Sequence, residues 1–313
     1  MTAFPILGLH HVTATVDDAQ ADLDFGIDAL GLRLVKKTVN FDNHGVYHFY
    51  YGDERGTPGT LWTTFPYKGR GVRIGEKGAG QVTMTSFSVP AGSLDEWKAR
   101  LRARGFTVTD APPRFGEESI IVTDPSGLSM ELIANDRDQR TPWRAGVPAG
   151  SAVRGLHSVT ITVRALKPTS EFMADLLGFE VVNEREGRTR VAVNGDEPGK
   201  TIDIVHSDEA CTAVNGIGTV HHVAMAITDG DEQRRLRDEI VRRGLQVTPV
   251  MDRQYFTSIY FREPGGVLFE VATLKPGFAI DEDVADLGRS LKLPPDAEAD
   301  RNAIEQALPI VHY

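Results

Sequence analysis

Internal repetition constrains the fold of this chain more than any other feature of its sequence. The motif Gly-Leu-His-His-Val-Thr at residues 8–13 returns as Gly-Leu-His-Ser-Val-Thr at 155–160, and residues 25–31 return at 172–178 with the same offset. Within these halves, residues 104–106 match 243–245, and Asp-Pro-Ser-Gly at 124–127 matches Glu-Pro-Gly-Gly at 263–266. The chain therefore contains four related units, arranged as two homologous modules.

The four units share one order of local patterns. An apolar run such as residues 12–16 or 223–227 predicts a strand, and an amphipathic stretch such as 94–104 or 232–243 predicts a helix. Two or three further apolar runs follow a glycine that suits the left-handed end of the helix; these glycines are Gly31, Gly105, Gly178 and Gly244. We therefore predict an α+β fold of four βαβββ units. Two units that lie side by side in space form a half-barrel of eight strands around a cup.

The repeats also set the expected domain boundaries. Residues 1–140 form the predicted N-terminal module and residues 151–273 the C-terminal module, with two units each. A polar, Pro- and Gly-rich linker lies between them. Residues 274–313 fall outside the repeat and carry one short helical pattern at 297–307, so we expect a tail that packs over the modules.

Composition narrows the class of function. The charged fraction of 25% and the apolar fraction of 41% are typical of a soluble globular protein. We find no apolar stretch long enough to span a membrane and no signal peptide at the N-terminus, and Cys211 is the only cysteine, so we expect a cytoplasmic protein without disulfides. The net charge of −10 offers no basic field for nucleic acid. These features fit an enzyme that acts on a small molecule, and they are compatible with a homo-oligomer.

Two positions of the repeat carry residues that can bind a metal. The first position, near the start of each unit, holds His11, Thr83, Ser158 and His222, and the second, on the last strand, holds Thr63, Glu131, Asp203 and Glu270. Equivalent positions share a face of the strand, so all of these side chains should point into a cup. Only a pairing of the first unit with the fourth unites two histidines and a carboxylate. We therefore predict that His11, His222 and Glu270 bind one divalent metal.

This set of donors favours iron. Two histidines and one carboxylate form the facial triad that leaves positions open on Fe(II) for oxygen and substrate, whereas structural zinc prefers four protein ligands. Taken singly, a histidine or glutamate on a strand is more often structural. Glu131 has no histidine pair in its cup, so it is either structural or a relic of duplication. His44, His48, His206 and His312 follow no repeat and are interpreted as ordinary residues.

These motifs resemble a known family. Leu-His-His-Val-Thr at 9–13, Val-His-His-Val at 220–223 and Pro-Gly-Gly-Val-Leu-Phe-Glu at 264–270 resemble the vicinal oxygen chelate superfamily of glyoxalases and extradiol dioxygenases. Tyr-His-Phe-Tyr at 47–50, Gly-Thr-Pro-Gly-Thr at 56–60, Arg-Phe-Gly at 114–116 and the tail segment 278–293 are similar to the hydroquinone ring-cleaving dioxygenases. The resemblance covers nearly the whole chain.

The resemblance implies an enzyme that cleaves an aromatic ring with dioxygen. It implies Fe(II), with Mn(II) as the alternative metal, on the same three ligands. It also implies an inner ring of helper residues, which are His10, Thr13, His221, Arg253 and Tyr260. Thr13 has the strand parity of His11 and should face the cup. His10 and His221 have the opposite parity, so packing against a helix is an equal alternative for both, and His157 at the same repeat position supports it.

The repeat tests two of the helpers further. Arg253 aligns with Arg114 of a unit that lacks a metal, so a structural role is as well founded as a catalytic one. Tyr260 aligns with Ile121 and is peculiar to the last unit, where it can exchange a proton or hydrogen bond with a phenolate. We expect Trp62, Phe65 and Phe269 to form the apolar wall of the site, although aromatic residues on strands are more often core.

Two other functions remain open. A glyoxalase-like isomerase or lyase would want a fourth protein ligand, and Thr63 occupies that position. A non-catalytic binding protein of the same fold would lack a complete ligand set. The accepted ring substituents and the oligomeric state stay open at this point.

Overall fold

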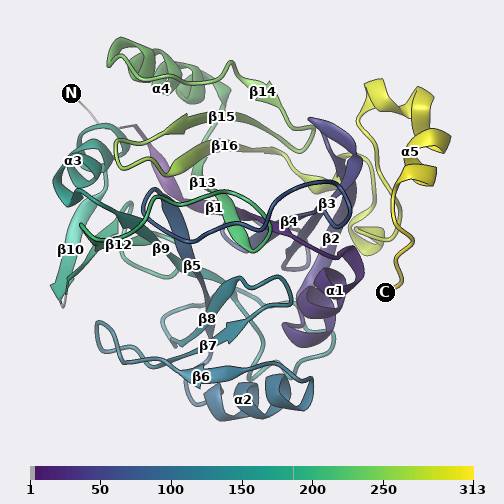
Figure 1. Ribbon diagram of the computed structural model, residues 1–313, viewed down its shortest axis with the longest axis horizontal. Coiled ribbons are helices and arrows are strands. Elements are labelled where there is room, and N and C mark those ends of the chain that lie inside the picture. The colour runs from purple at the N-terminus through teal and green to yellow at the C-terminus, as the bar shows by residue number, and fades with distance from the viewer. Residues whose placement is uncertain (1–3, 186) are drawn as a thin grey trace.

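The computed structural model describes residues 4–185 and 187–313 and shows two curved, eight-stranded sheets with the helices on their outer faces (Figure 1). Residues 1–3, part of the segment searched for a signal peptide, lie outside the described residues. Each of the four units has the order βαβββ, as the repeat predicts. The sheets cover one another closely, and one cluster of buried apolar side chains draws residues from both.

The first two units occupy residues 6–134. Unit 1 contains β1 (Ile6–Val16), α1 (Ala19–Leu23), a π-helical continuation (Asp24–Ala29), β2 (Arg33–Asn40), β3 (Asn43–Gly52) and β4 (Leu61–Pro66). Unit 2 contains β5 (Gln81–Val89), α2 (Leu94–Ala103), β6 (Val108–Asp110), β7 (Ser119–Thr123) and β8 (Ser129–Ala134).

The last two units occupy residues 155–276. Unit 3 contains β9 (Gly155–Val163), α3 (Leu166–Leu177), β10 (Glu180–Arg185), β11 (Arg188–Ala192) and β12 (Thr201–His206). Unit 4 contains β13 (Thr219–Ile227), α4 (Gly230–Arg242), β14 (Met251–Asp252), β15 (Phe256–Arg262) and β16 (Leu268–Pro276). The glycines that follow the four helices all have positive φ, which lets each helix end there.

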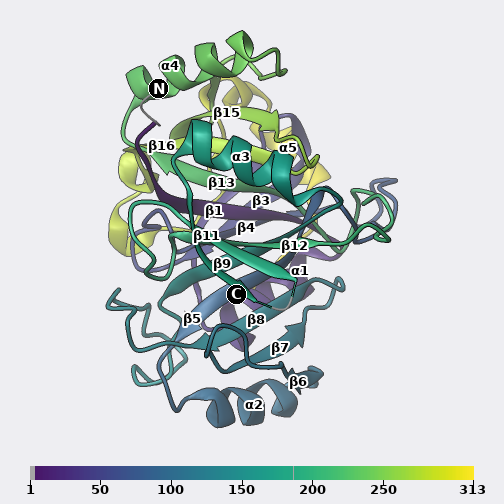
Figure 2. The ribbon, with the colours of Figure 1, turned by 90° about the vertical axis from the view of Figure 1, so that its left-hand side faces the viewer.

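The units pair out of sequence order. The first sheet runs β14-β15-β16-β13-β1-β4-β3-β2 and so joins units 1 and 4, while the second runs β10-β11-β12-β9-β5-β8-β7-β6 and joins units 2 and 3. The joining contacts are antiparallel, between β1 and β13 and between β5 and β9. Figure 2 shows β1 and β13 side by side although 202 residues, 17–218, lie between these two strands in the sequence. The predicted pairing of the first unit with the last is confirmed.

A bulge interrupts each of the four central strands at the same repeat position. His10 is the extra residue of β1 and His221 that of β13, while Thr83 and His157 are the extra residues of β5 and β9. A bulge bends the strand and re-aims the side chain of the extra residue. Simple alternation of faces therefore fails at this position, which matters for the site described below.

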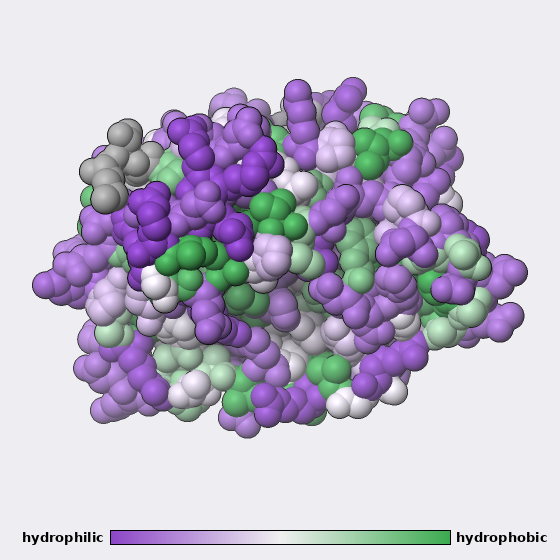
Figure 3. Space-filling model, turned by 90° about the horizontal axis from the view of Figure 1, so that it is seen from above, coloured by the Kyte–Doolittle hydropathy of each residue, from purple (hydrophilic) through white to green (hydrophobic). Residues whose placement is uncertain are grey.

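Helix α4 illustrates how the outer faces are built. Asp229 accepts hydrogen bonds from the backbone of Asp231 and Glu232 and so caps the N-terminus of the helix. Leu236 and Ile240 are buried against the sheet. The opposite side of the helix is charged, and hydrophilic side chains dominate this face of the molecule (Figure 3). No described helix is long and apolar enough to cross a membrane.

The C-terminal tail packs along the outer edge of the first sheet. It contains three 3-10 turns (Phe278–Ile280, Val284–Asp286 and Pro295–Asp300) and α5 (Arg301–Ala307), close to the predicted helix at 297–307. Lys36 on β2 is fully buried and donates to Asp281 at 2.6 Å and Glu282 at 2.5 Å. Such a buried ion pair fixes the tail beside β2, as Figure 1 shows for α5.

Candidate metal centre

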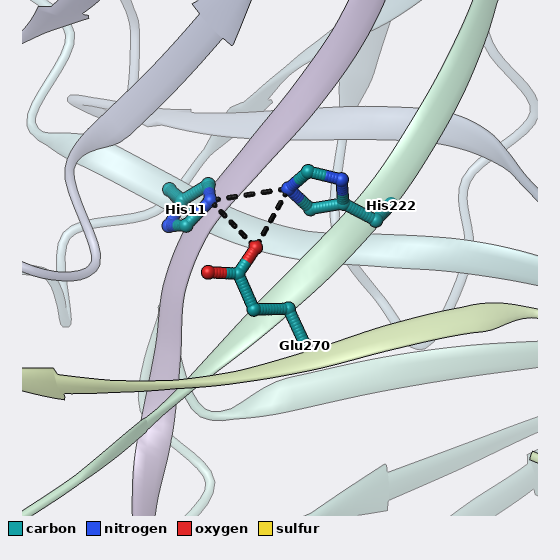
Figure 4. A group of neighbouring side chains, drawn as sticks. All are labelled: His11, His222 and Glu270. Atoms are coloured by element: carbon teal, nitrogen blue, oxygen red, sulfur yellow. Dashed lines mark hydrogen bonds and ion pairs between the residues drawn. The ribbon is translucent and has the colours of Figure 1, made fainter. Parts of the chain in front are cut away.

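Three side chains from units 1 and 4 converge on one point inside the first sheet. His11 lies on β1, His222 on the neighbouring β13 and Glu270 on β16, next to β13. Nε2 of His222 is 2.8 Å and Nε2 of His11 is 3.2 Å from Oε2 of Glu270, and the two Nε2 atoms are 3.3 Å apart (Figure 4). An ion with bonds of about 2.1 Å would hold ligands at right angles about 3.0 Å apart. This triangle has the size that one bound metal ion requires.

The hydrogen bonds behind the three donors fit a metal. Nδ1 of His11 is 2.9 Å from Nδ1 of His10, and Nδ1 of His222 is 2.8 Å from Nδ1 of His221. When His11 and His222 donate these Nδ1 protons, their Nε2 lone pairs face each other and the Glu270 carboxylate. Oε1 of Glu270 accepts from Ser258, whereas Oε2 is buried without a hydrogen bond in the described structure. A cation between these three acceptors would satisfy all of them at once.

The electrostatics keep the donors ready for a metal. Burial would raise the pKa of Glu270, but His11 and His222 beside it hold that pKa well below its usual value. Burial lowers the pKa of His222, although Glu270 opposes the shift. A deprotonated carboxylate and neutral imidazoles are the forms that bind metal. The group formed by His11, His222 and Glu270 could therefore hold one divalent ion.

His10 and His221, which directly precede His11 and His222, support these two candidate ligands. Because of the bulges, the rings of His10 and His221 turn toward His11 and His222 instead of away from them. Burial lowers the pKa of both to about 3, so they are neutral. Only His221 also lines the adjoining cavity. Neither residue therefore fits the alternative of packing against a helix. Each one contacts Nδ1 of the histidine that follows it in the sequence.

A cavity of about 430 Å³ opens directly from the three donors. Its walls come from the strands and loops of units 1 and 4 and are rich in aromatic residues, which are Phe41, Tyr50, Phe65, Tyr67, Phe256 and Tyr260. Phe65 lines it as predicted. Trp62 and Phe269 do not line the cavity. Each directly precedes a cup-facing residue on its strand, so its side chain points to the other face of the sheet, into the apolar core.

Arg253 and Tyr260 stand together on one side of this cavity. Nε of Arg253 donates to Oη of Tyr260 at 3.1 Å, and the Tyr260 ring lies edge-on to His222 with centroids 5.6 Å apart. Burial raises the pKa of Tyr260, so its hydroxyl stays protonated. The guanidinium group of Arg253 also contacts both carboxylate oxygens of Asp42, at 3.3 and 3.1 Å.

Thr13 and His48 lie on the other side. Thr13 faces the cup, but its hydroxyl contacts that of Thr63 at 2.8 Å, and both residues are fully buried behind the cavity wall. Nε2 of His48 completes the chain at 3.0 Å from the Thr63 hydroxyl, and His48 itself lines the cavity. His48 was interpreted as an ordinary residue because it follows no repeat, and that interpretation did not anticipate its place at the cavity. Its parity with Tyr50 on β3, beside Thr63 on β4, was the available signal.

The second sheet forms an equivalent cup with different contents. Glu131 takes the position of Glu270, but Ser86 and Arg114 donate to its Oε2 at 2.6 and 2.5 Å, and Ser119 donates to Oε1 at 2.6 Å. Both oxygens of the carboxylate therefore accept hydrogen bonds from protein groups. Glu131 is thus held in an ion-paired network, which favours the structural one of its two alternatives.

The rest of the second cup extends that network. Arg190 contacts Asp203 at 2.7 Å and Glu117 at 2.8 Å, and Arg188 contacts Asp203 at 3.5 Å. His157 bonds to Glu117 through Nε2 and to Ser158 through Nδ1, at 2.9 and 3.1 Å. His157 thus orients the next residue just as His10 does in the first cup.

One predicted repeat position needs correction. In the strand register, the residues opposite the four second positions are Thr13, Ser86, Thr160 and Ala224. The first position lies two residues before each of these, so in unit 2 it is Met84 rather than Thr83. The shared offset failed because units 2 and 4 differ by one residue between this strand and the following helix. Thr83 is the bulged residue instead.

Comparison with known proteins agrees with this architecture. Residues 8–132 and 155–271 match the family described as the Glyoxalase/Bleomycin resistance protein/Dioxygenase superfamily. The chain is 42% identical to "Putative ring-cleaving dioxygenase MhqE" of Bacillus subtilis, over 96% of this chain and 98% of the relative. It is 38% identical to the chlorohydroquinone/hydroquinone 1,2-dioxygenase of Sphingobium indicum, over 97% of each chain.

A solved structure extends the likeness to three dimensions. The crystal structure of a "putative dioxygenase" from Bacillus subtilis superposes with a TM-score of 0.94 at 39% identity and covers 99% of each chain. The protein therefore belongs to the glyoxalase and dioxygenase superfamily, and the relatives named above at 38–42% identity are named as ring-cleaving or hydroquinone dioxygenases.

Proposed function

We propose that this protein is an Fe(II)-dependent, extradiol-type dioxygenase that cleaves the ring of a hydroquinone or a related phenol. The observation that carries the proposal is the position of the His11, His222 and Glu270 group at the end of an aromatic-lined cavity. Three protein ligands on one side of an ion leave the opposite side free for substrate and oxygen. Relatives with nearly full-length coverage carry names of this activity, which supports the same assignment.

The bound ion would supply Lewis-acid activation of the phenol and coordination of dioxygen. The chain supplies the remainder. Tyr260 accepts a hydrogen bond from Arg253, and its own O–H can donate to a substrate oxygen in the cavity. When His222 donates Nδ1–H to His221, His221 carries its proton on Nε2 and presents a second donor to the cavity.

The walls hold the ring and limit water. Phe65 and Tyr50 lie against the His48 ring, with centroids 4.3 and 4.0 Å away, and form one apolar side. Phe256 contacts His11 and covers the other approach, with centroids 5.4 Å apart. A flat aromatic substrate fits between such walls by stacking. Their exclusion of water strengthens the hydrogen bonds to the reacting groups.

A glyoxalase-like isomerase or lyase is the second candidate, and one contact argues against it. That chemistry would use a fourth protein ligand at the position of Thr63. The Thr63 hydroxyl is instead engaged by Thr13 and His48 and does not line the cavity. A non-catalytic binding protein of the same fold would lack a complete ligand set, whereas His11, His222 and Glu270 lie together here.

Oxygen uptake separates these functions. The purified protein is reconstituted anaerobically with Fe(II) or Mn(II) and then mixed with oxygen and a panel of hydroquinones and catechols. The proposal expects one oxygen consumed per ring opened, with highest activity on a hydroquinone and with Fe(II). Turnover of a thiol adduct of a 2-oxoaldehyde without oxygen consumption would support the isomerase instead. Binding of phenols without any turnover would support the binding protein.

A further inference from the structure

An ion pair between units 1 and 4 lines the mouth of the cavity, at its solvent-exposed end. Asp42 lies in the turn between β2 and β3, and Arg253 lies in the loop between β14 and β15. The two side chains meet through two N–H···O contacts of 3.3 and 3.1 Å, and both line the cavity. The Asp42 side chain is 66% exposed and that of Arg253 is 16% exposed, so Asp42 forms the outer end of the pair.

Both partners are held in place by their own loops. The backbone N–H of Asp42 donates to Oδ1 of Asn40 at 2.9 Å, and Nδ2 of Asn40 donates to Oη of Tyr67 at 3.1 Å. On the other side, the Arg253 N–H donates to the Phe256 carbonyl at 2.9 Å, and the next residue, Gln254, has a φ of +63°. A non-glycine residue in that region is held there by its surroundings. The backbones that carry the two partners are thus fixed on both sides of the cavity, which favours their contact.

Arg253 is already paired with an anion. It is the only lysine or arginine among the described residues that line the cavity, and three of its five N–H groups serve Asp42 and Tyr260. A ligand carboxylate at this end would find no free cation and would lie beside the Asp42 carboxylate. Like charges placed together at a binding surface oppose binding strongly. A neutral ring meets no such penalty.

We propose that Asp42 is a specificity residue that excludes aromatic substrates with a carboxylate group and so restricts the site to uncharged phenols. The proposal rests on the proposed function for its choice of phenolic ligands. Asp42 acts in two ways, since it repels the anion directly and keeps Arg253 engaged. Removal of its charge should therefore release Arg253 as a carboxylate partner.

Ligand binding tests this inference without turnover. The Fe(II)-loaded protein is titrated anaerobically by calorimetry with 4-methylphenol and with 4-hydroxybenzoate, in which the carboxylate lies opposite the phenol. The measured quantity is the ratio of the two dissociation constants. In Asp42→Asn the ratio should shift toward the carboxylate by about tenfold or more, because one like charge is gone and Arg253 is free. The double variant Asp42→Asn with Arg253→Gln should lose most of that gain.

A matched control removes general effects of charge. Asp196 forms an exposed pair with Arg137 at 2.6 Å, in loops that follow strands of the second sheet and away from the cavity. Asp196→Asn changes the net charge equally and should leave the ratio unchanged. An unchanged ratio in Asp42→Asn, an equal shift in Asp196→Asn, or no binding of either phenol to any variant would overturn the inference. Oxygen uptake with hydroquinone is measured separately, so failure of the proposed function remains distinguishable.

Discussion

Glu270 and Glu131 occupy equivalent positions in the two cups, yet their carboxylates have different partners. Glu270 has one serine donor and one buried oxygen that faces two histidines. Glu131 has two serine donors and an arginine, which together satisfy both oxygens. The backbone of the repeat places a carboxylate in each cup. The neighbouring first-position residues decide whether this carboxylate can bind a metal. They are His11 and His222 in the first cup, and Ser158 and Met84 in the second.

Arg253 and Arg114 show the same divergence at another equivalent position. Arg114 reaches into its cup and contacts Glu131. In the first cup Tyr260 replaces Ile121, and Arg253 contacts the tyrosine hydroxyl and Asp42 at the mouth. The carboxylate of Glu270 is thereby left for a metal. One duplicated arginine therefore serves stability in one cup and the cavity in the other.

Loss of a proposed ligand should give the largest effect. We expect His222→Ala to weaken metal binding by more than the roughly 10- to 100-fold that loss of a supporting contact costs, because a direct ligand is removed. His157→Ala, which changes the second cup, should retain the metal. Metal content after dialysis and the metal-dependent shift in melting temperature measure both. Equal metal loss in the two variants would contradict the difference between the cups.

The aligned arginines should separate stability from function. Arg114→Ala leaves Glu131 buried beside Asp203 without its ion pair, so we expect the free energy of unfolding to fall by about 3 kcal/mol. Arg253→Ala breaks a pair with an exposed partner and should cost about 1 kcal/mol or less. Urea denaturation measures both variants without metal. Similar losses would show that the two arginines have the same structural role.

The second cup should also respond to acid through Glu117. Burial alone would raise the pKa of this carboxyl, but the contacts with His157 and Arg190 lower it from 4.5 to about 2. The folded state therefore binds this proton more weakly than the unfolded state. Glu117 should contribute about 2–3 kcal/mol to stability above pH 4.5, and this contribution should disappear as the pH falls to about 2.

Glu117→Gln isolates this term. The difference in unfolding free energy between wild type and the variant, measured by urea denaturation at a series of pH values, should be constant near neutrality and shrink in the acid range. A difference that stays constant down to pH 2 would rule out the ion pairs as its source.

His48 should give the smallest effect. His48→Phe removes the bond to Thr63 but keeps a flat ring between Tyr50 and Phe65, so we expect kcat/KM on a hydroquinone to fall by about tenfold, the value of one hydrogen bond. His206→Phe, at an exposed position, is the matched control. Unchanged kinetics in His48→Phe would remove His48 from the site.

The sequence predicted the parts of this molecule that repeat. Four copies of one pattern were enough for the βαβββ units, for the pairing of unit 1 with unit 4 and for the meeting of His11, His222 and Glu270. Single-residue register was not predictable, because bulges at His10 and Thr83 break the alternation of faces on which parity depends. Contacts between elements without repeats, such as Asp42 with Arg253, depend on loop geometry and side-chain direction that no pattern in one sequence encodes.

A crystal structure of the Fe(II)-loaded protein, with anomalous diffraction at the iron edge, tests the central claim most directly. The account predicts one anomalous peak, between Nε2 of His11, Nε2 of His222 and Oε2 of Glu270, and none in the second cup beside Glu131. A peak in the second cup, or a peak in the first cup that does not contact all three of these atoms, would contradict it.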